Sequence, residues 1–482
     1  MDKNQIDKTE FDELKSQLTK EKKRVLDALP QDGQEAAFAF CQDYKTFLDQ
    51  AKTEREAVKT IVRLAEENGF RPLDDCQPDS KGPAKVYQVY KNRAVALAVT
   101  GKQKMARGAR IIASHIDAPR LDLKQNPLYE DLDLALLKTH YYGGIRKYQW
   151  LCIPLALHGT LVDSQGKTQD IVIGEDPDDP VFTITDLLPH LAREQAGKKI
   201  ADVFQGEKLN LIAGHLPLGD PELKERFKLG VLKLLHDQYG ITEEDFISAD
   251  IQAVPAGMAR DVGLDRAIIG AYGQDDRICA YTSLAAILDI QETEQTAVAF
   301  FFDKEEIGSD GNAGAKSRLV EDFLGDLMAL NQEATDSRSL RKAMIRSACL
   351  SADVNAAMDP DYKDVHESSN APTLGQGPCL TKFTGSGGKS GSSEADAEFM
   401  GHIRNLFNAN GVVWQTGELG KIDQGGGGTV AKFLAKYGMD VLDCGPAVLS
   451  MHSPFELSSK ADVYMTYQAY KAFYSGVYGQ DN

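Results

Sequence analysis

The sequence predicts an α/β protein in which a mixed sheet is flanked by helices and interrupted by an inserted β-rich segment. Alternating and apolar stretches typical of buried strands run from residue 84 to 117. Between about 118 and 258 the pattern changes to short strand-like pieces separated by turns. After about 262, strand-like and helix-like segments alternate, as they do in sheets covered by helices. We therefore expect a discontinuous domain formed by 1–117 and 259–482, with 118–258 inserted as a second unit.

The N-terminal elements follow from charge and periodicity. The first 60 residues are charged and mostly helix-forming, and the amphipathic stretch 54–70 predicts a helix that ends at a glycine. Two strands are expected in 84–102 and 108–117, and the second brings His115 to its end. In the inserted segment, a Gly-Gly turn and the Pro/Asp-rich loop 175–182 separate the strand-like pieces.

The C-terminal half of the chain alternates between the two periodicities. Apolar runs that predict buried strands occupy 296–308, 344–355 and 439–448. Patterns that predict helices lie between and after them, at 278–290, 394–411 and 460–479. Such an order is typical of a sheet whose polar ligands collect beyond the carboxyl ends of its strands.

Composition excludes several classes of function. The chain has 482 residues, 42% of them hydrophobic, which is enough for a large core. A formal net charge of -18 argues against nucleic acid and anionic membranes as partners. We find no span of apolar residues that could cross a bilayer and no signal peptide, so a cytoplasmic location is expected. The seven scattered cysteines predict buried, reduced thiols and no zinc knuckle.

Five residues that suit a metal follow apolar, strand-like segments in the order His, Asp, Glu, Asp, His. Together they make the ligand set expected of a hydrolase with two metal ions, and they are His115, Asp275, Glu306, Asp353 and His452. Two histidines and three carboxylates suit zinc, cobalt or manganese better than calcium or magnesium. Asp275 lies where a strand gives way to a helix, and its two oxygens could bridge two cations.

Two further carboxylates support this set. His115 and Asp117 are two residues apart and share a face of an extended chain, so one can bind metal while the other holds it in place. Glu305 and Glu306 adjoin each other after three phenylalanines, and a bend at Ile307-Gly308 would let both face one site. One of them would coordinate a metal, and the other would remain free to move a proton. Three other acidic residues are expected to be turn or surface charges, namely Asp276, Asp303 and Asp310.

These segments resemble the M18 family of metalloaminopeptidases, and in particular its bacterial aminopeptidase I branch. The resemblance covers most of the chain and rests on SHIDAPRLDLK, GAYGQDDRICAYTSL, FFDKEEIGSDGNAGAKS, LSADVNAAMDPDY and GPAVLSMHSPFELSSKADVY. It implies a zinc-peptidase-like catalytic domain, an inserted β-rich dimerisation domain, and a homo-oligomer that is a tetrahedral dodecamer. It also implies two divalent metal ions in each subunit, and peptides with a free N-terminus as substrates.

The resemblance assigns a role to each candidate residue. His115 and Asp353 would hold one metal, and Glu306 and His452 the other. Asp275 would bridge the two ions. As for catalysis, Glu305 would be the general acid and base, and Asp117 would support His115.

The aspartyl aminopeptidase branch carries a W-[FYL]-D-R-D-L motif where this chain has Trp150-Leu151-Cys152-Ile153-Pro154-Leu155, so its preference for acidic N-terminal residues does not carry over directly. Three residues are candidates for substrate binding: His366 in a loop after Asp353, Lys389 in a Gly/Ser-rich loop, and His190 as a contribution from a neighbouring subunit. Each of them also has an ordinary structural or surface interpretation. Two other functions stay open: a deacylase or other two-metal amide hydrolase, and a non-catalytic scaffold or cargo-binding protein.

Overall fold

The protein is described by a computed structural model that covers residues 7–77, 83–163 and 165–478. A nine-stranded mixed sheet forms its centre, in the order β1-β2-β3-β13-β4-β14-β20-β16-β18. The strands span Arg71–Pro72, Lys85–Tyr90, Ala94–Val99, Ala297–Phe302, Arg110–His115, Ala348–Ser351, Asp440–Gly445, Cys379–Thr381 and Gln415–Thr416 in that order. The four strands β13, β4, β14 and β20 run parallel to one another.

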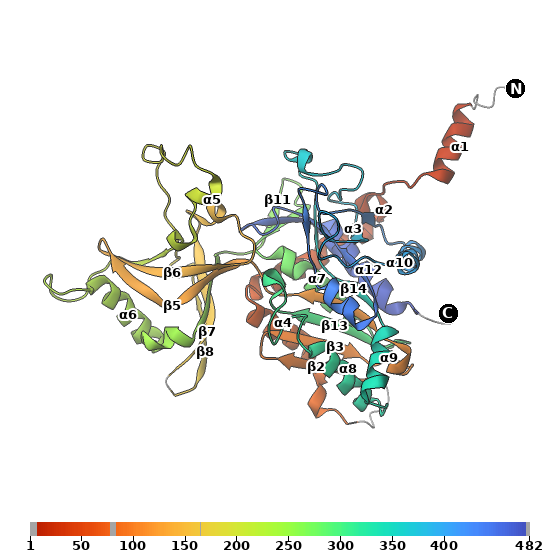
Figure 1. Cartoon of the computed structure of the whole chain (residues 1–482), viewed down its shortest axis with the longest axis horizontal. Coiled ribbons are helices and arrows are strands. Elements are labelled where there is room, and N and C mark those ends of the chain that lie inside the picture. The colour runs from red at the N-terminus through yellow and green to blue at the C-terminus, as the bar shows by residue number, and fades with distance from the viewer. Residues whose placement is uncertain (1–6, 78–82, 164, 479–482) are drawn as a thin grey trace.

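Helices cover both faces of this sheet (Figure 1). One face packs against α3 (Gln31–Gln50), α4 (Glu54–Glu67), α7 (Gln274–Leu288), α10 (Ala397–Ala409) and α12 (Lys460–Ser475). The opposite face packs against α8 (Leu319–Leu330), α9 (Ser337–Ile345) and α11 (Ala431–Leu434). Strand β13 shows why its sequence is apolar throughout: Phe301 enters the first core while Phe300 and Phe302 enter the second. A strand buried on both faces has no polar side.

A separate antiparallel sheet is built from the chain between Arg120 and Pro255. Its order is β8-β7-β10-β5-β6-β9, and its strands span Thr168–Ile173, Leu155–Val162, Asp250–Pro255, Arg120–Asp131, Leu134–Tyr142 and Leu211–Gly214. It has its own hydrophobic core and projects from the central sheet together with α5 (Ile200–Val203) and α6 (Arg226–Tyr239) (Figure 1). We call residues 120–255 the inserted unit. Their strands lie within the predicted insertion 118–258, and the exact division into domains stays a prediction.

The structure also contains two smaller sheets. The five-stranded sheet β11-β12-β22-β21-β15 consists of Arg260–Val262, Ile268–Ala271, Glu456–Ser459, Ala447–Leu449 and Asn355–Ala356. The strands β17 (Gly385–Ser386) and β19 (Gly426–Gly427) form a two-stranded sheet.

The predicted fold class is confirmed, and the helices predicted from periodicity lie close to their expected places. Helix α4 begins with a capping box between Thr53 and Glu56, and the chain leaves it at Gly69 with φ +84°. At the N-terminus, α1 (Lys8–Leu18) buries none of its side chains and points away from the body, followed by the short α2 (Val25–Ala28) (Figure 1). Within the described residues, no helix is both long and apolar enough to span a bilayer.

Three expectations from the sequence are wrong in detail. Asp276 and Asp303 are fully buried and not surface charges, because α7 and the end of β13 both pack into the interior. The cysteines are not all buried, since Cys152 is exposed and Cys76 is half-buried. As expected, Asp310 is exposed, and it forms an ion pair with Lys316.

Candidate metal centre

Neighbouring parallel strands bring the first candidate ligands together. His115 is the last residue of β4 and is paired in register with Phe302, the last residue of β13. Asp353 comes two residues after the end of β14, on the other side of β4. The carboxyl ends of parallel strands meet at one edge of a sheet, so these side chains share one site.

Two of the remaining candidates lie next to strands of the five-stranded sheet, and the two glutamates follow β13 of the central sheet. Asp275 lies in the first turn of α7, directly after β12, and His452 lies in the turn between β21 and β22 with φ +63°. Glu305 and Glu306 form a single 3-10 turn, flanked by Lys304 at φ +68° and Gly308 at φ +94°. The chain therefore bends after β13, as the sequence predicts, and both glutamates face the site.

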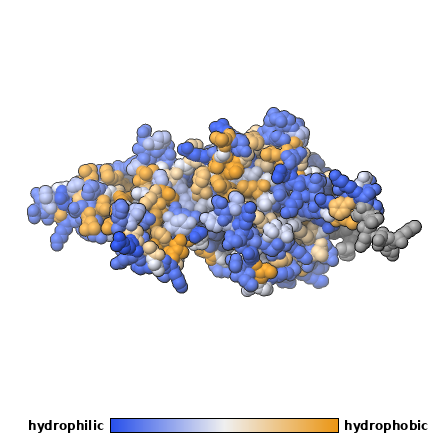
Figure 2. Space-filling model, turned by 90° about the horizontal axis from the view of Figure 1, so that it is seen from above, coloured by the Kyte–Doolittle hydropathy of each residue, from blue (hydrophilic) through white to orange (hydrophobic). Residues whose placement is uncertain are grey.

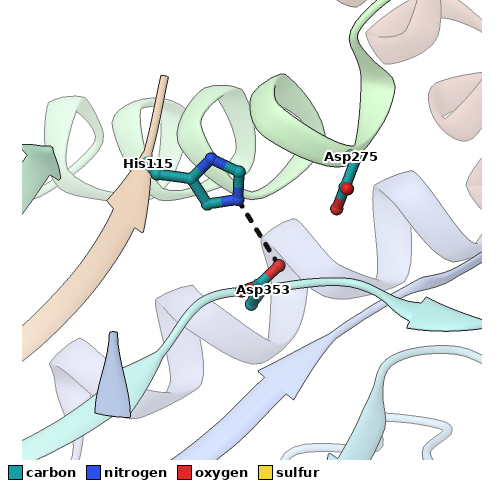
Figure 3. A group of neighbouring side chains, drawn as sticks. All are labelled: His115, Asp275 and Asp353. Atoms are coloured by element: carbon teal, nitrogen blue, oxygen red, sulfur yellow. Dashed lines mark ion pairs between the residues drawn. The ribbon is translucent and has the colours of Figure 1, made fainter. Parts of the chain in front are cut away.

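His115, Asp275 and Asp353 form one potential metal-binding group. Their ligand atoms lie within 4.8 Å of one another, and the three side chains point toward a common space from a strand end, a helix and a loop (Figure 3). His115 Nε2 is 3.5 Å from Asp353 Oδ1, while His115 Nδ1 faces the carbonyl of Asp117 at 3.3 Å. A proton on Nδ1 leaves Nε2 free for a cation.

Asp275, Glu306 and His452 form a second group of the same kind. His452 Nε2 lies 2.9 Å from Asp275 Oδ2 and 3.4 Å from Glu306 Oε1. His452 Nδ1 donates to the carbonyl of Gly144 at 3.0 Å, which again directs Nε2 into the site. Burial lowers the pKa of His452, but Asp275 and Glu306 outweigh it and raise the pKa to about 11. Asp275 belongs to both of these groups. A third group within the described residues consists of His115, Asp276 and Glu306, whose ligand atoms lie equally close together.

Asp117 connects this centre to the loop that carries the two glutamates. Its Oδ1 accepts the backbone N–H of Glu305 at 3.0 Å, and its Oδ2 accepts that of Glu306 at 3.1 Å. Tyr142 also donates its hydroxyl to Oδ2, at 2.8 Å. Burial would raise the pKa of Asp117, yet His115 and Tyr142 outweigh it, so the pKa is lowered. The carboxylate stays ionised and acts only as an acceptor.

Glu305 differs from the five candidate ligands. Its carboxylate belongs to none of the groups that could hold an ion, although it lines the same cavity. Burial, reinforced by Asp353 and Asp117, raises its pKa to about 8. A glutamate with such a pKa accepts and releases a proton near neutral pH, which is the requirement for a general acid and base.

The structure adds two residues that the sequence did not reveal as part of the site. Glu456, at the start of β22, is buried and accepts the backbone N–H groups of Gln274, Asp275 and His452 at 2.5, 3.1 and 2.6 Å. Asp276 lies 3.6 Å from His115 Nδ1, and neither of its oxygens has a hydrogen-bond partner among the described residues. The only sequence signal for Glu456 is its position four residues after His452, which by itself is too common to interpret.

The three candidates for substrate binding lie in different surroundings. Lys389 lines the cavity, where it pairs with Glu394 at 2.9 Å and stacks over Phe383. His366 is buried but is not among the residues that line the cavity. His190 is exposed in an irregular part of the inserted unit. Their roles in binding stay predictions.

The cavity over the metal centre has a volume of about 450 Å³. The residues that line it include the candidate metal ligands, the glycine-rich run 425–428, Lys421 and Lys432. Glycines allow a ligand backbone to approach closely. The cavity is therefore large enough for the end of a peptide but not for a folded chain.

The site holds many more carboxylates than imidazoles. Seven carboxylates surround the two imidazoles, and they are Asp117, Asp275, Asp276, Glu305, Glu306, Asp353 and Glu456. Burial and mutual repulsion raise the pKa of Glu306 well above its usual range and that of Glu456 to about 8. Divalent ions would relieve this repulsion, and a mixed imidazole and carboxylate set suits zinc. Fold and site thus define a metal-dependent hydrolase of α/β architecture whose ligand groups suit two ions.

Comparison with known proteins identifies the family. The family model described as "Aminopeptidase I zinc metalloprotease (M18)" matches residues 47–474. A "Probable M18 family aminopeptidase 1" of Thermotoga maritima is 52% identical over 435 residues, which cover 90% of this chain and 95% of the relative. Another from Clostridium acetobutylicum is 46% identical over 463 residues, covering 95% and 99%. The chain belongs to the M18 family, and it is a metal-dependent aminopeptidase.

Solved structures agree with this assignment. The crystal structure of an M18 aminopeptidase from Thermotoga maritima matches with a TM-score of 0.91 at 49% identity, covering 95% of this chain and all of the other. Aminopeptidase I from Clostridium acetobutylicum matches with a TM-score of 0.89 at 45% identity, with the same coverage. A yeast mApe1 structure described as a dodecamer shares the fold, with a TM-score of 0.72 at 21% identity.

Proposed function

We propose that this aminopeptidase removes N-terminal residues from peptides, and that it uses two metal ions held by its five candidate ligands. His115 and Asp353 would hold one ion, Glu306 and His452 the other, and Asp275 would bridge them. The observation that carries this proposal is that Asp275 shares one group of ligand atoms with His115 and Asp353 and another with Glu306 and His452. Divalent ions bound there would supply Lewis acidity, which lowers the pKa of water and polarises the scissile carbonyl.

The residues of the chain would perform the proton transfers and position the substrate. Glu305 takes a proton from the attacking water and delivers it to the leaving amine, because its pKa of about 8 suits both steps. Asp117 holds the backbone of Glu305 through Oδ1. The excess of carboxylates in the cavity favours a protonated α-amino group at the end of a peptide. An acylated N-terminus lacks that charge and would bind less well.

Substrate binding beyond the α-amino group would involve the other residues that line the cavity. Lys389 is proposed to contact the substrate, since it lines the cavity. His366 is proposed to act only indirectly, through the loop that carries it. His190 would contribute only to the site of a neighbouring subunit, in keeping with its exposed position in the inserted unit.

We also propose that the protein is a homo-oligomer, specifically a tetrahedral dodecamer assembled through the inserted unit. Exposed leucines support this, because the single chain leaves many of them in contact with water on this unit: Leu187, Leu188, Leu191, Leu216, Leu223, Leu229 and Leu234. Figure 2 shows hydrophobic side chains on the surface of the part of the molecule that contains the inserted unit. We further propose a cytoplasmic location, and the net negative charge of the chain argues against nucleic acid and anionic membranes as partners.

A substrate panel tests the activity directly. The protein is dialysed against a chelator, reloaded with zinc, cobalt or manganese, and assayed with aminoacyl-p-nitroanilides, free dipeptides and their N-acetylated forms. We expect metal-restored cleavage confined to free N-termini. Release of acetate from the N-acetylated substrates, with no cleavage of free N-termini, would identify a deacylase, and inactivity with every metal would favour a scaffold. Size-exclusion chromatography with light scattering tests the dodecamer independently.

A further inference from the structure

The inserted unit reaches the metal centre through the base of its first hairpin. Strand β5 begins three residues after Asp117, and its first residue, Arg120, is paired in register with Tyr142 at the end of β6. The next turn supplies Gly144, whose carbonyl accepts from His452 Nδ1. The start of the insertion is therefore next to both histidine-bearing segments.

Tyr142 is held at both ends of its side chain. Its ring lies over the guanidinium of Arg120, with 3.7 Å between Cζ and the ring centroid. Arg120 is itself buried, donates to Asp122 at 2.8 Å and approaches Glu54 at 3.7 Å. The hydroxyl of Tyr142 donates to Asp117 Oδ2 at 2.8 Å. The stacked ring limits the positions that the hydroxyl can take.

The contact with Asp117 influences the two glutamates of the site. Oδ2 of Asp117 accepts both the Tyr142 hydroxyl and the backbone N–H of Glu306, while Oδ1 accepts the N–H of Glu305. Without the hydroxyl, the carboxylate would have freedom to turn toward His115 Nδ1, which is 3.7 Å from Oδ1. A rotation of that kind would weaken both backbone contacts at once.

We propose that Tyr142 is a positioning residue of the aminopeptidase reaction, whose hydroxyl fixes Asp117 so that Glu305 and Glu306 keep their places. The inference rests on the proposed function of these glutamates. Tyr142 acts through Asp117 and touches neither substrate nor metal. Its loss should therefore reduce turnover and metal affinity more than substrate affinity.

The test uses the full-length, zinc-loaded enzyme and the variant Tyr142→Phe, which keeps the ring over Arg120. We expect kcat to fall about 10-fold or more, KM to change less than about 2-fold, and the zinc dissociation constant to rise about 10-fold, as is typical when a hydrogen bond behind the ligands is lost. Zinc affinity is measured by competition with a chelating dye, and folding by thermal melting. Tyr141→Phe is the matched control, because Tyr141 is exposed and its hydroxyl has no hydrogen bond within the described chain.

A double mutant separates positioning through Asp117 from a general effect on packing. In the Asp117→Asn background, Tyr142→Phe should cause no further loss of kcat. The proposal would be overturned if the losses of kcat in the two single variants multiplied in the double mutant. It would also be overturned if Tyr142→Phe kept the wild-type kcat and zinc affinity, or if it changed KM alone. If Tyr142→Phe did not fold, Asp117→Asn alone would test the contact, and unchanged kcat and zinc affinity there would overturn it. A wild-type enzyme inactive on every substrate would refute the proposed function instead, and the zinc measurement would still test Tyr142.

Discussion

Glu456 offers the clearest test of how the metal centre is held in place. Its carboxylate accepts three backbone N–H groups, two on Oε2 from Gln274 and Asp275 and one on Oε1 from His452. Glu456→Ala leaves all three donors without this acceptor in a buried region. An unsatisfied buried donor costs about 1–3 kcal/mol, so the alanine variant should lose about 3–9 kcal/mol of stability. That is a large share of the roughly 5–15 kcal/mol typical of folded domains.

Glu456→Gln should be milder, because one amide oxygen can replace Oε2 and keep two of the three bonds. Only the N–H of His452 then faces an NH₂ group, at a cost of about 1–3 kcal/mol. Urea unfolding followed by circular dichroism, with zinc and with chelator, measures both variants. Glu292→Gln is the control, since Glu292 forms a surface ion pair with Lys102 and its loss should leave the midpoint unchanged. An alanine variant as stable as the wild type would refute this account of Glu456.

Three further predictions address catalysis, metal binding and pH. Glu305→Gln should lower kcat by about 10²–10⁴-fold while elemental analysis finds the wild-type metal content, and near-normal turnover would remove Glu305 as the base. Asp275→Ala should lose metal at both positions, because it belongs to both ligand groups; retention of two ions by mass spectrometry would contradict a bridging role. His158 lies between Glu56 and Glu175 at 2.7 and 2.9 Å, and although burial lowers its pKa, the two carboxylates outweigh burial and raise it. The wild type should therefore be more stable than His158→Gln, with the largest difference below about pH 6.5 and a smaller one as the pH rises through the raised pKa of His158. A difference in urea midpoints that does not change with pH would exclude this ion pair.

Much of the fold could be predicted because its signals are local. The continuous apolar run Ala297–Phe302 is read as a doubly buried strand, and the Thr53–Glu56 capping box marks where α4 begins. His115 and Asp353 could be placed together because the rule for parallel strand ends does not depend on the details of packing. The sequence therefore contains enough information for the sheet and for the histidines and carboxylates at its edge.

The residues that hold these ligands in place are determined by tertiary register, which local patterns do not encode. Glu456 approaches α7 only because β22 pairs with β12 so that Glu456 lies opposite Ala271, a few residues before Asp275. Tyr142 reaches Asp117 only because β6 pairs with β5 in the register that sets it against Arg120. A shift of one residue in either pairing would turn the side chain to the other face of its sheet. The burial of Asp276 also depends on tertiary packing. Helix α7 is buried on all sides, and its sequence alone does not reveal that. The sequence thus predicts which histidines and carboxylates meet at the edge of the sheet, whereas strand register determines which residues hold them in place.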